Sequence, residues 1–172
     1  IETPKEDLAL RSSDFAINGT DFNYSATNNF DFLTSKFDHL IPISDSIDIG
    51  ISQLKSVLEK GNSNLKITGY ALTSEENNSI FPNLGLARAN SVKNYFVSKG
   101  IPENKIELFG EIADNLATKN DTLFGPVSFD LLKVDTTNAP AKDWSALKAK
   151  INANPLTVYF EIIIKISNSL FL

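Results

Sequence analysis

The sequence contains no cysteine, no methionine and only one histidine, His39. Without cysteine the chain can form no disulfide, no thiolate metal site and no thiol nucleophile. The surroundings of His39, "FDHL", supply neither an orienting partner nor a nucleophile. We therefore expect no catalytic activity, no metal and no cofactor. The chain begins with Ile1 and not with methionine, which we interpret as a processed or trimmed chain.

Basic residues and long hydrophobic runs are also scarce. Lysine and arginine together number 16 against 21 acidic residues, a net charge of -5, and no basic patch stands out. Since a duplex-binding surface needs a basic surplus, we expect no nucleic-acid partner. The longest apolar stretch, "EIIIKISNSLFL", is interrupted by Glu161 and Lys165, so no membrane span is expected. The length of 172 residues fits one ordinary domain with extensions.

The first third of the chain predicts a hairpin, a short strand and a helix. Apolar residues alternate on both sides of Asn18-Gly19, the strongest short signal for a hairpin. A strand is predicted over residues 30–33. A helix is predicted from about Asp45 to Lys60, with a left-handed stop at Gly61. Its apolar stripe consists of Ile47, Ile51, Leu54 and Leu58.

The rest of the chain alternates strands with helices. Strands are predicted over residues 64–72, 105–111 and 126–134, and a helix from about Asn83 to Lys99 that Gly100 ends. A connection with one helical turn is expected before Pro126. A linker, a short helix and a strand are predicted within residues 135–172. This order predicts an α+β fold with helices packed on a mixed sheet.

The motifs in this order resemble the OmpA-like domain family over residues 29–134. "NNFDFLTSKF" and "LKITGYA" resemble its first two strands, and "LGLARANSVKNYFVSKGIPENKIELFGE" resembles its second helix and third strand. "NDTLFG", which contains Asn120, resembles its Asn-Asp-Thr loop. The resemblance implies an OmpA-like βαβαββ sandwich, here with an N-terminal arm and hairpin (residues 1–28) and a C-terminal helix-strand extension (residues 135–172).

In that family the domain holds the stem peptide of peptidoglycan, and the resemblance implies which residues would do so here. An Asp after the second strand grips the ammonium of the diamino acid, and an Arg on the second helix grips its carboxylate. Arg88 stands at the position of that Arg, but Leu72 stands at the position of the Asp. Glu75 or Glu76 in the following loop could supply the missing negative charge.

Two interpretations of Arg88 remain open at this point. It could anchor a stem-peptide carboxylate, with Tyr70, Glu75, Glu76 and Asn120 as the other ligand-binding residues. Alternatively, it could lie over the edge of the core and pair with Glu75, Glu76 or Glu111.

The two interpretations lead to two functions. The first is a periplasmic, outer-membrane-associated module that binds peptidoglycan and tethers the outer membrane to the cell wall, as in lipoproteins of this family. The second is a degenerate OmpA-like domain that binds an envelope protein and has lost wall binding. Its interface could be the added C-terminal strand, because exposed strand edges pair with other chains. "NPLTVYFEI" near the C-terminus resembles the first strand of a second such unit, which suggests a tandem protein.

Overall fold

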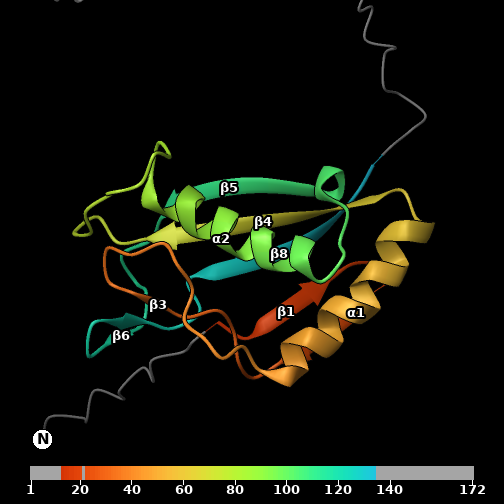
Figure 1. Ribbon diagram of the computed structural model, residues 1–172, viewed down its shortest axis with the longest axis horizontal. Helices are drawn as coiled ribbons and strands as arrows, with labels where there is room; N and C mark the ends of the chain where they lie inside the picture. The colour runs from red at the N-terminus through yellow and green to blue at the C-terminus, as the bar shows by residue number, and fades with distance from the viewer. Residues whose placement is uncertain (1–12, 21, 135–172) are drawn as a thin grey trace, which may run out of the picture. The chain divides into compact units, whose positions relative to one another are not determined.

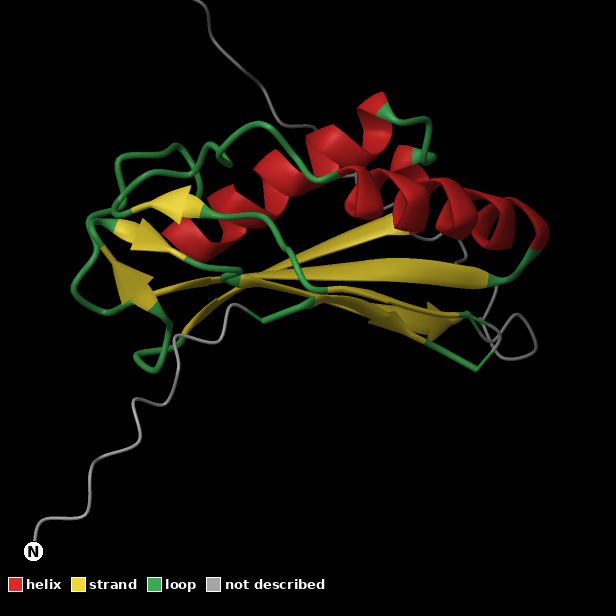
Figure 2. Cartoon of the chain, turned by 90° about the horizontal axis from the view of Figure 1, so that it is seen from below, coloured by secondary structure: helices red, strands yellow, loops and turns green. Residues whose placement is uncertain are grey.

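The computed structural model describes residues 13–20 and 22–134. These residues form a five-stranded mixed sheet with strand order β2-β1-β8-β4-β5 and a small three-stranded sheet with order β3-β7-β6. Two helices lie on the same side of the larger sheet (Figure 2). The α+β class with helices on a mixed sheet is therefore confirmed.

Figure 1 shows the order of the elements along the chain. Strand β4 pairs in parallel with β5 through the crossover helix α2, as expected, and antiparallel with β8. The hairpin strand β1 pairs in parallel with β8. The bounds are β1 Phe15–Asn18, β2 Asn23–Ala26, β3 Phe32–Leu33, α1 Asp45–Lys60, β4 Ser63–Ala71, α2 Leu84–Ser98, a 3-10 turn η1 Glu103–Lys105, β5 Ile106–Ile112, β6 Thr118–Lys119, β7 Thr122–Leu123 and β8 Val127–Lys133.

The core lies between the helices and the sheet. Helix α1 buries the stripe that its sequence predicts, Ile47, Ile51, Leu54 and Leu58. Helix α2 contributes Val92 and Phe96, and the Phe96 ring stacks on Phe129 of β8 at 5.5 Å between centroids. Phe15 of β1 is fully buried in the same cluster. The hairpin is thus part of the sheet and of the core.

Two glycines bring α2 against the sheet. A Cβ added at Gly69 of β4 would lie 2.1 Å from the carbonyl oxygen of Gly85 in α2. Only glycine allows the two backbones to approach this closely. The first turns of α2 therefore lie directly over the end of β4, which places Arg88 beside Tyr70 and the loop that follows.

The hairpin predicted around Asn18-Gly19 is confirmed as the antiparallel pair β1 and β2, which runs from Phe15 and Ala26 to Asn18 and Asn23. Two other local predictions are wrong. Gly61 ends α1 with φ of -116°, which is extended and not left-handed backbone. The segment before Pro126 forms the hairpin β6–β7 in place of a helical turn. Its turn residues Asn120 and Asp121 have φ of 50° and 59°, values that Asn and Asp tolerate better than most residues do.

Several predictions remain untested, most of them because they concern residues that the structure does not describe. The C-terminal linker, helix and strand and the second OmpA-like unit fall within residues 135–172, outside the described part. The boundary predicted at residue 29 stays a prediction. Within residues 13–20 and 22–134, no helix is long and apolar enough to cross a membrane.

Candidate functional site

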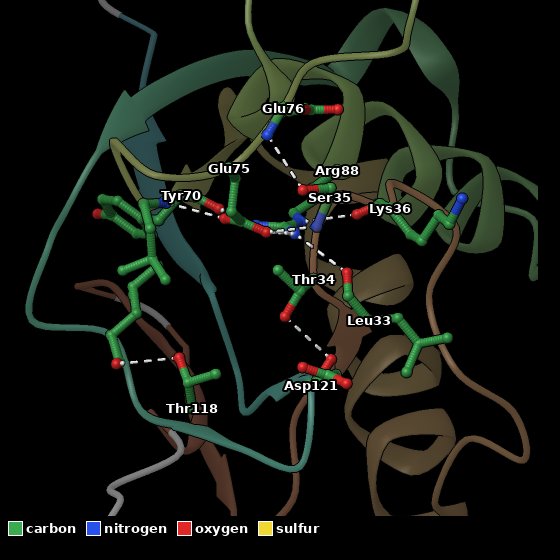
Figure 3. Close-up of polar contacts among 12 residues, drawn as sticks. Leu33, Thr34, Ser35, Lys36, Tyr70, Glu75, Glu76, Arg88, Thr118 and Asp121 are labelled. Carbon is green, nitrogen blue, oxygen red and sulfur yellow. Dashed lines mark hydrogen bonds and ion pairs between the residues drawn. The ribbon is translucent and has the colours of Figure 1, made fainter.

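The candidate site is centred on Arg88, whose side chain is completely buried. It projects from α2 toward the end of β4, the turn after β3 and the loop between β4 and α2 (Figure 3). The face of the Phe32 ring lies 5.3 Å from the guanidinium carbon, a cation–π distance. A buried charge of this kind is stable only where every donor finds a partner.

All five N–H groups of the Arg88 guanidinium have acceptors within the chain. Nε donates to the carbonyl of Lys36 at 3.0 Å. Nη1 donates to the carbonyl of Tyr70 and to Oε2 of Glu75, both at 2.9 Å. Nη2 donates to the carbonyl of Leu33 at 3.3 Å and to Oε1 of Glu75 at 2.5 Å. Because an arginine has five donors, none is left for a ligand in this conformation.

Glu75 is as fully enclosed as Arg88, with 0% of its side chain exposed. Besides the two bonds from Arg88, its carboxylate accepts the backbone N–H of Ser35 and of Leu72, each at 2.8 Å. Burial raises the pKa of Glu75, but the hydrogen bonds from Arg88, Ser35 and Leu72 outweigh it and leave the pKa lowered. The two charges therefore form a bidentate pair, both ionised at neutral pH.

Ser35 joins the turn after β3 to the loop that carries Glu75. Its φ of 56° is left-handed, which is uncommon for a residue other than glycine. Its N–H binds Glu75, and its hydroxyl accepts the N–H of Glu76 at 3.0 Å. Sequence reasoning missed Ser35 and the carbonyls of Leu33 and Lys36, since main-chain acceptors carry no residue preference that a motif could reveal.

The structure brings only part of the predicted site together. Glu75 and the carbonyl of Tyr70 meet Arg88, whereas Glu76 is exposed and takes part through its backbone. The Tyr70 ring points away from Arg88 (Figure 3), and its hydroxyl lies 3.0 Å from Oγ of Ser128. Asn120 is exposed at the tip of the β6–β7 turn. Of the carboxylates proposed as partners of Arg88, Glu75 is therefore the one that pairs with it.

The Tyr70 ring lines a cavity of about 390 Å³. The walls are mainly apolar, with Leu116 and Phe124 among them, and Ser128 adds a hydroxyl. This cavity is distinct from the Arg88 pair, so Tyr70 contributes its backbone to one site and its ring to another.

Leu72, which the resemblance places at the family's Asp position, contributes its backbone N–H to Glu75 and has no carboxylate to offer. The next residue, Thr73, binds Asp114 twice, from its N–H at 2.7 Å and from its hydroxyl at 2.9 Å. These two bonds lower the pKa of Asp114. Sequence reasoning missed this acidic residue, which comes from the connection after β5. Among the described residues, no cluster of His, Cys, Asp and Glu could hold a metal ion.

Comparisons with known proteins agree with the resemblance in the sequence. Residues 41–124 match the model of the OmpA family. A search of curated proteins finds no match. Solved structures similar to this chain include the C-terminal domain of MotB from Helicobacter pylori, with 16% identity over 75% of this chain and 98% of that one and a TM-score of 0.41. Another is the OmpA-like domain of FopA1 from Francisella tularensis, with 15% identity over 76% of this chain and 88% of that one and a TM-score of 0.42. Residues 41–124 of this chain are therefore similar to the OmpA family, the same family that the sequence motifs resemble.

Proposed function

We propose that this domain is a non-catalytic module of the cell envelope that has kept the OmpA-like scaffold for assembly with a protein partner. In this proposal Glu75 closes the site at which relatives in the family are expected to hold a stem-peptide carboxylate. We place the module in the periplasm, associated with the outer membrane through a partner or a membrane anchor.

The observation that carries the proposal is that every N–H group of the Arg88 guanidinium is already bound to an acceptor within the domain. A carboxylate ligand needs two parallel N–H groups of the guanidinium fork. Both are bound to Glu75, and the Arg88 side chain is 0% exposed. A ligand would have to displace a carboxylate that two further backbone N–H groups also hold.

The second candidate is recognition of the peptidoglycan stem peptide, which would tether the outer membrane to the cell wall. It is favoured by the position of Glu75 on residues 72–83, which form neither helix nor strand. Opening of this segment would expose the Arg88 fork and release the carboxylates of Glu75 and Glu76 to meet an ammonium group. In this second candidate, Tyr70 and Asn120 remain proposed contributors to the ligand site.

Co-sedimentation with purified peptidoglycan sacculi tests the two candidates. We expect the unmodified chain to stay in the supernatant. Glu75→Ala, which frees the fork, is expected to pellet if the closed site is otherwise intact, and Glu76→Ala serves as the matched control. Circular dichroism checks that each variant is folded.

The opposite pattern would overturn the proposal. If the unmodified chain pellets and Arg88→Lys stays in solution, the domain binds the wall through Arg88. Lysine retains the positive charge but cannot form the bidentate contact, so this variant separates specific recognition from general attraction.

A further inference from the structure

Strand β5 forms one margin of the five-stranded sheet, and β4 is its only neighbour among the described strands. Figure 1 shows β5 along the outer side of the sheet, with helix α2 over its inner face. The parallel ladder with β4 runs over seven residues without a bulge, from Ile106 to Ile112. The opposite edge of β5 therefore presents backbone groups to which a further strand could bind.

The hydrogen bonds identify which residues face that edge. The N–H of Ala113 donates to the carbonyl of Ala71 in β4, so residues 107, 109, 111 and 113 direct their backbone groups toward β4. Because these directions alternate along a strand, the groups of Ile106, Leu108, Gly110 and Ile112 point outward.

Two of the outward groups already have partners. The N–H of Ile106 binds the carbonyl of Glu103, and the carbonyl of Gly110 accepts from Asn83 at 3.5 Å. Leu108 and Ile112 are left with both of their backbone groups directed outward. An added strand pairs with every second residue, so Leu108, the N–H of Gly110 and Ile112 are the successive positions that it would meet.

The edge of β5 lacks three features that commonly block strand addition. Exposed strand edges often carry lysine, proline or a bulge. The sequence of β5, IELFGEI, contains neither residue, and its ladder with β4 has no bulge. It also exposes 43% of Phe109 and 56% of Ile112, which offers apolar surface beside the outward backbone groups.

The charge of the edge indicates what kind of strand fits it. Glu107 and Glu111 are exposed and alternate with Phe109, so all three lie on the sheet face away from α2. A second copy of β5 placed antiparallel about Phe109 would set Glu107 opposite Glu111, and like charges directly opposite are destabilising. A strand with basic side chains opposite these two residues would be attracted.

We propose that the free edge of β5 captures an extended, basic segment of a partner protein as an additional strand. The segment carries lysine or arginine at alternate positions, on either side of an apolar residue that packs on Phe109. The outward groups of Leu108 and Ile112 supply the main-chain hydrogen bonds, and Glu107 and Glu111 select the charge. This inference deepens the proposed assembly function and rests on it.

The experiment uses the whole chain and two synthetic peptides. One alternates lysine with valine around a central leucine, and the other has glutamate in place of each lysine. Titration followed by amide NMR should show tighter binding of the lysine peptide and shifts at Leu108, Gly110 and Ile112. Two variants should weaken this binding about tenfold, the double variant Glu107→Lys/Glu111→Lys and the single variant Ile112→Pro. Glu59→Lys on α1, a charge change away from β5, should leave it unchanged.

Three results would overturn the proposal. The glutamate peptide could bind as well as the lysine peptide, or the lysine peptide could leave the β5 amides unshifted. Light scattering could instead reveal a dimer that Ile112→Pro dissociates, which would make a second copy the occupant. The sacculus assay measures wall binding through Arg88 and does not depend on β5. A negative peptide titration would therefore overturn the β5 proposal alone, whereas wall binding by the unmodified chain would overturn the proposed function.

Discussion

Glu75→Gln is the substitution whose effect the structure defines most sharply. It keeps the size of the side chain and removes the negative charge that faces Arg88. The amide also places an NH₂ group where the carboxylate accepted hydrogen bonds, so at least one donor of the buried network loses its acceptor. The positive charge of Arg88 would then be buried without compensation.

The expected cost follows from the burial of both side chains. Breaking a buried ion pair by removing one partner destabilises a protein by about 3–5 kcal/mol. Native domains are stable by only about 5–15 kcal/mol, so the variant would lose a large share of its stability. At roughly 4 °C per kcal/mol for a domain of this size, the midpoint of thermal unfolding should fall by about 12–20 °C.

Thermal and urea unfolding followed by circular dichroism measure this effect. Glu76→Gln is the matched control, because Glu76 is adjacent and exposed and its described contact with Ser35 is through the backbone. We expect the control to change stability by less than about 0.5 kcal/mol, as is usual for surface substitutions. The double variant Glu75→Leu/Arg88→Met should recover only part of the loss. It leaves no unpaired ion, but the backbone groups that Glu75 and Arg88 bind lose these partners.

Equal stability of Glu75→Gln and Glu76→Gln would refute this reasoning. It would mean that the loop of residues 72–83 is open in solution and that water, not Glu75, compensates Arg88. The same result would favour the second candidate function, since an open loop exposes the carboxylate-binding fork.

Three further predictions concern the pH dependence of the Glu75 contribution, the close approach at Gly69 and the hydroxyl of Tyr70. Because the folded-state pKa of Glu75 lies below its usual 4.5, its stabilising contribution is complete above that pH and is lost as the pH falls through the lowered value. The stability difference between the unmodified chain and Glu75→Gln should therefore shrink in acid, as urea titrations between pH 7 and pH 3 would reveal. Gly69→Ala should prevent folding or cost several kcal/mol in thermal unfolding, because the methyl group meets the backbone of Gly85 at 2.1 Å. Tyr70→Phe should cost only about 0.5–1.5 kcal/mol in thermal unfolding, for the lost hydrogen bond between the Tyr70 hydroxyl and Ser128, and no measurable loss would contradict the importance of that bond.

Local sequence patterns predict most of the framework correctly. The stripe from Ile47 to Leu58 places α1 at residues 45–60, as observed. Gly100, with φ of 91°, lies just past the end of α2 as predicted. The strands β4, β5 and β8 lie within about one residue of their predicted bounds. These elements depend on spacing among near neighbours, which a single sequence displays directly.

Turns were predicted less well because their backbone angles depend on what they pack against. The Asn-Gly signal at residue 18 predicted the first hairpin correctly, but the left-handed backbone expected at Gly61 is extended. The Asn120-Asp121 turn carries a signal that could have been recognised, two residues tolerant of positive φ between Lys119 and Thr122.

The sequence by itself determined the class of fold, the family and the importance of Arg88. It left open which carboxylate, if any, would meet this residue. The tertiary structure decided that question by bringing together the loop that carries Glu75 and the turn after β3, whose Leu33 and Lys36 lie 55 and 52 residues before Arg88 in the chain. A helical stripe is set by residues three and four apart, whereas the partners of a buried charge are set by segments that meet only when the whole domain folds.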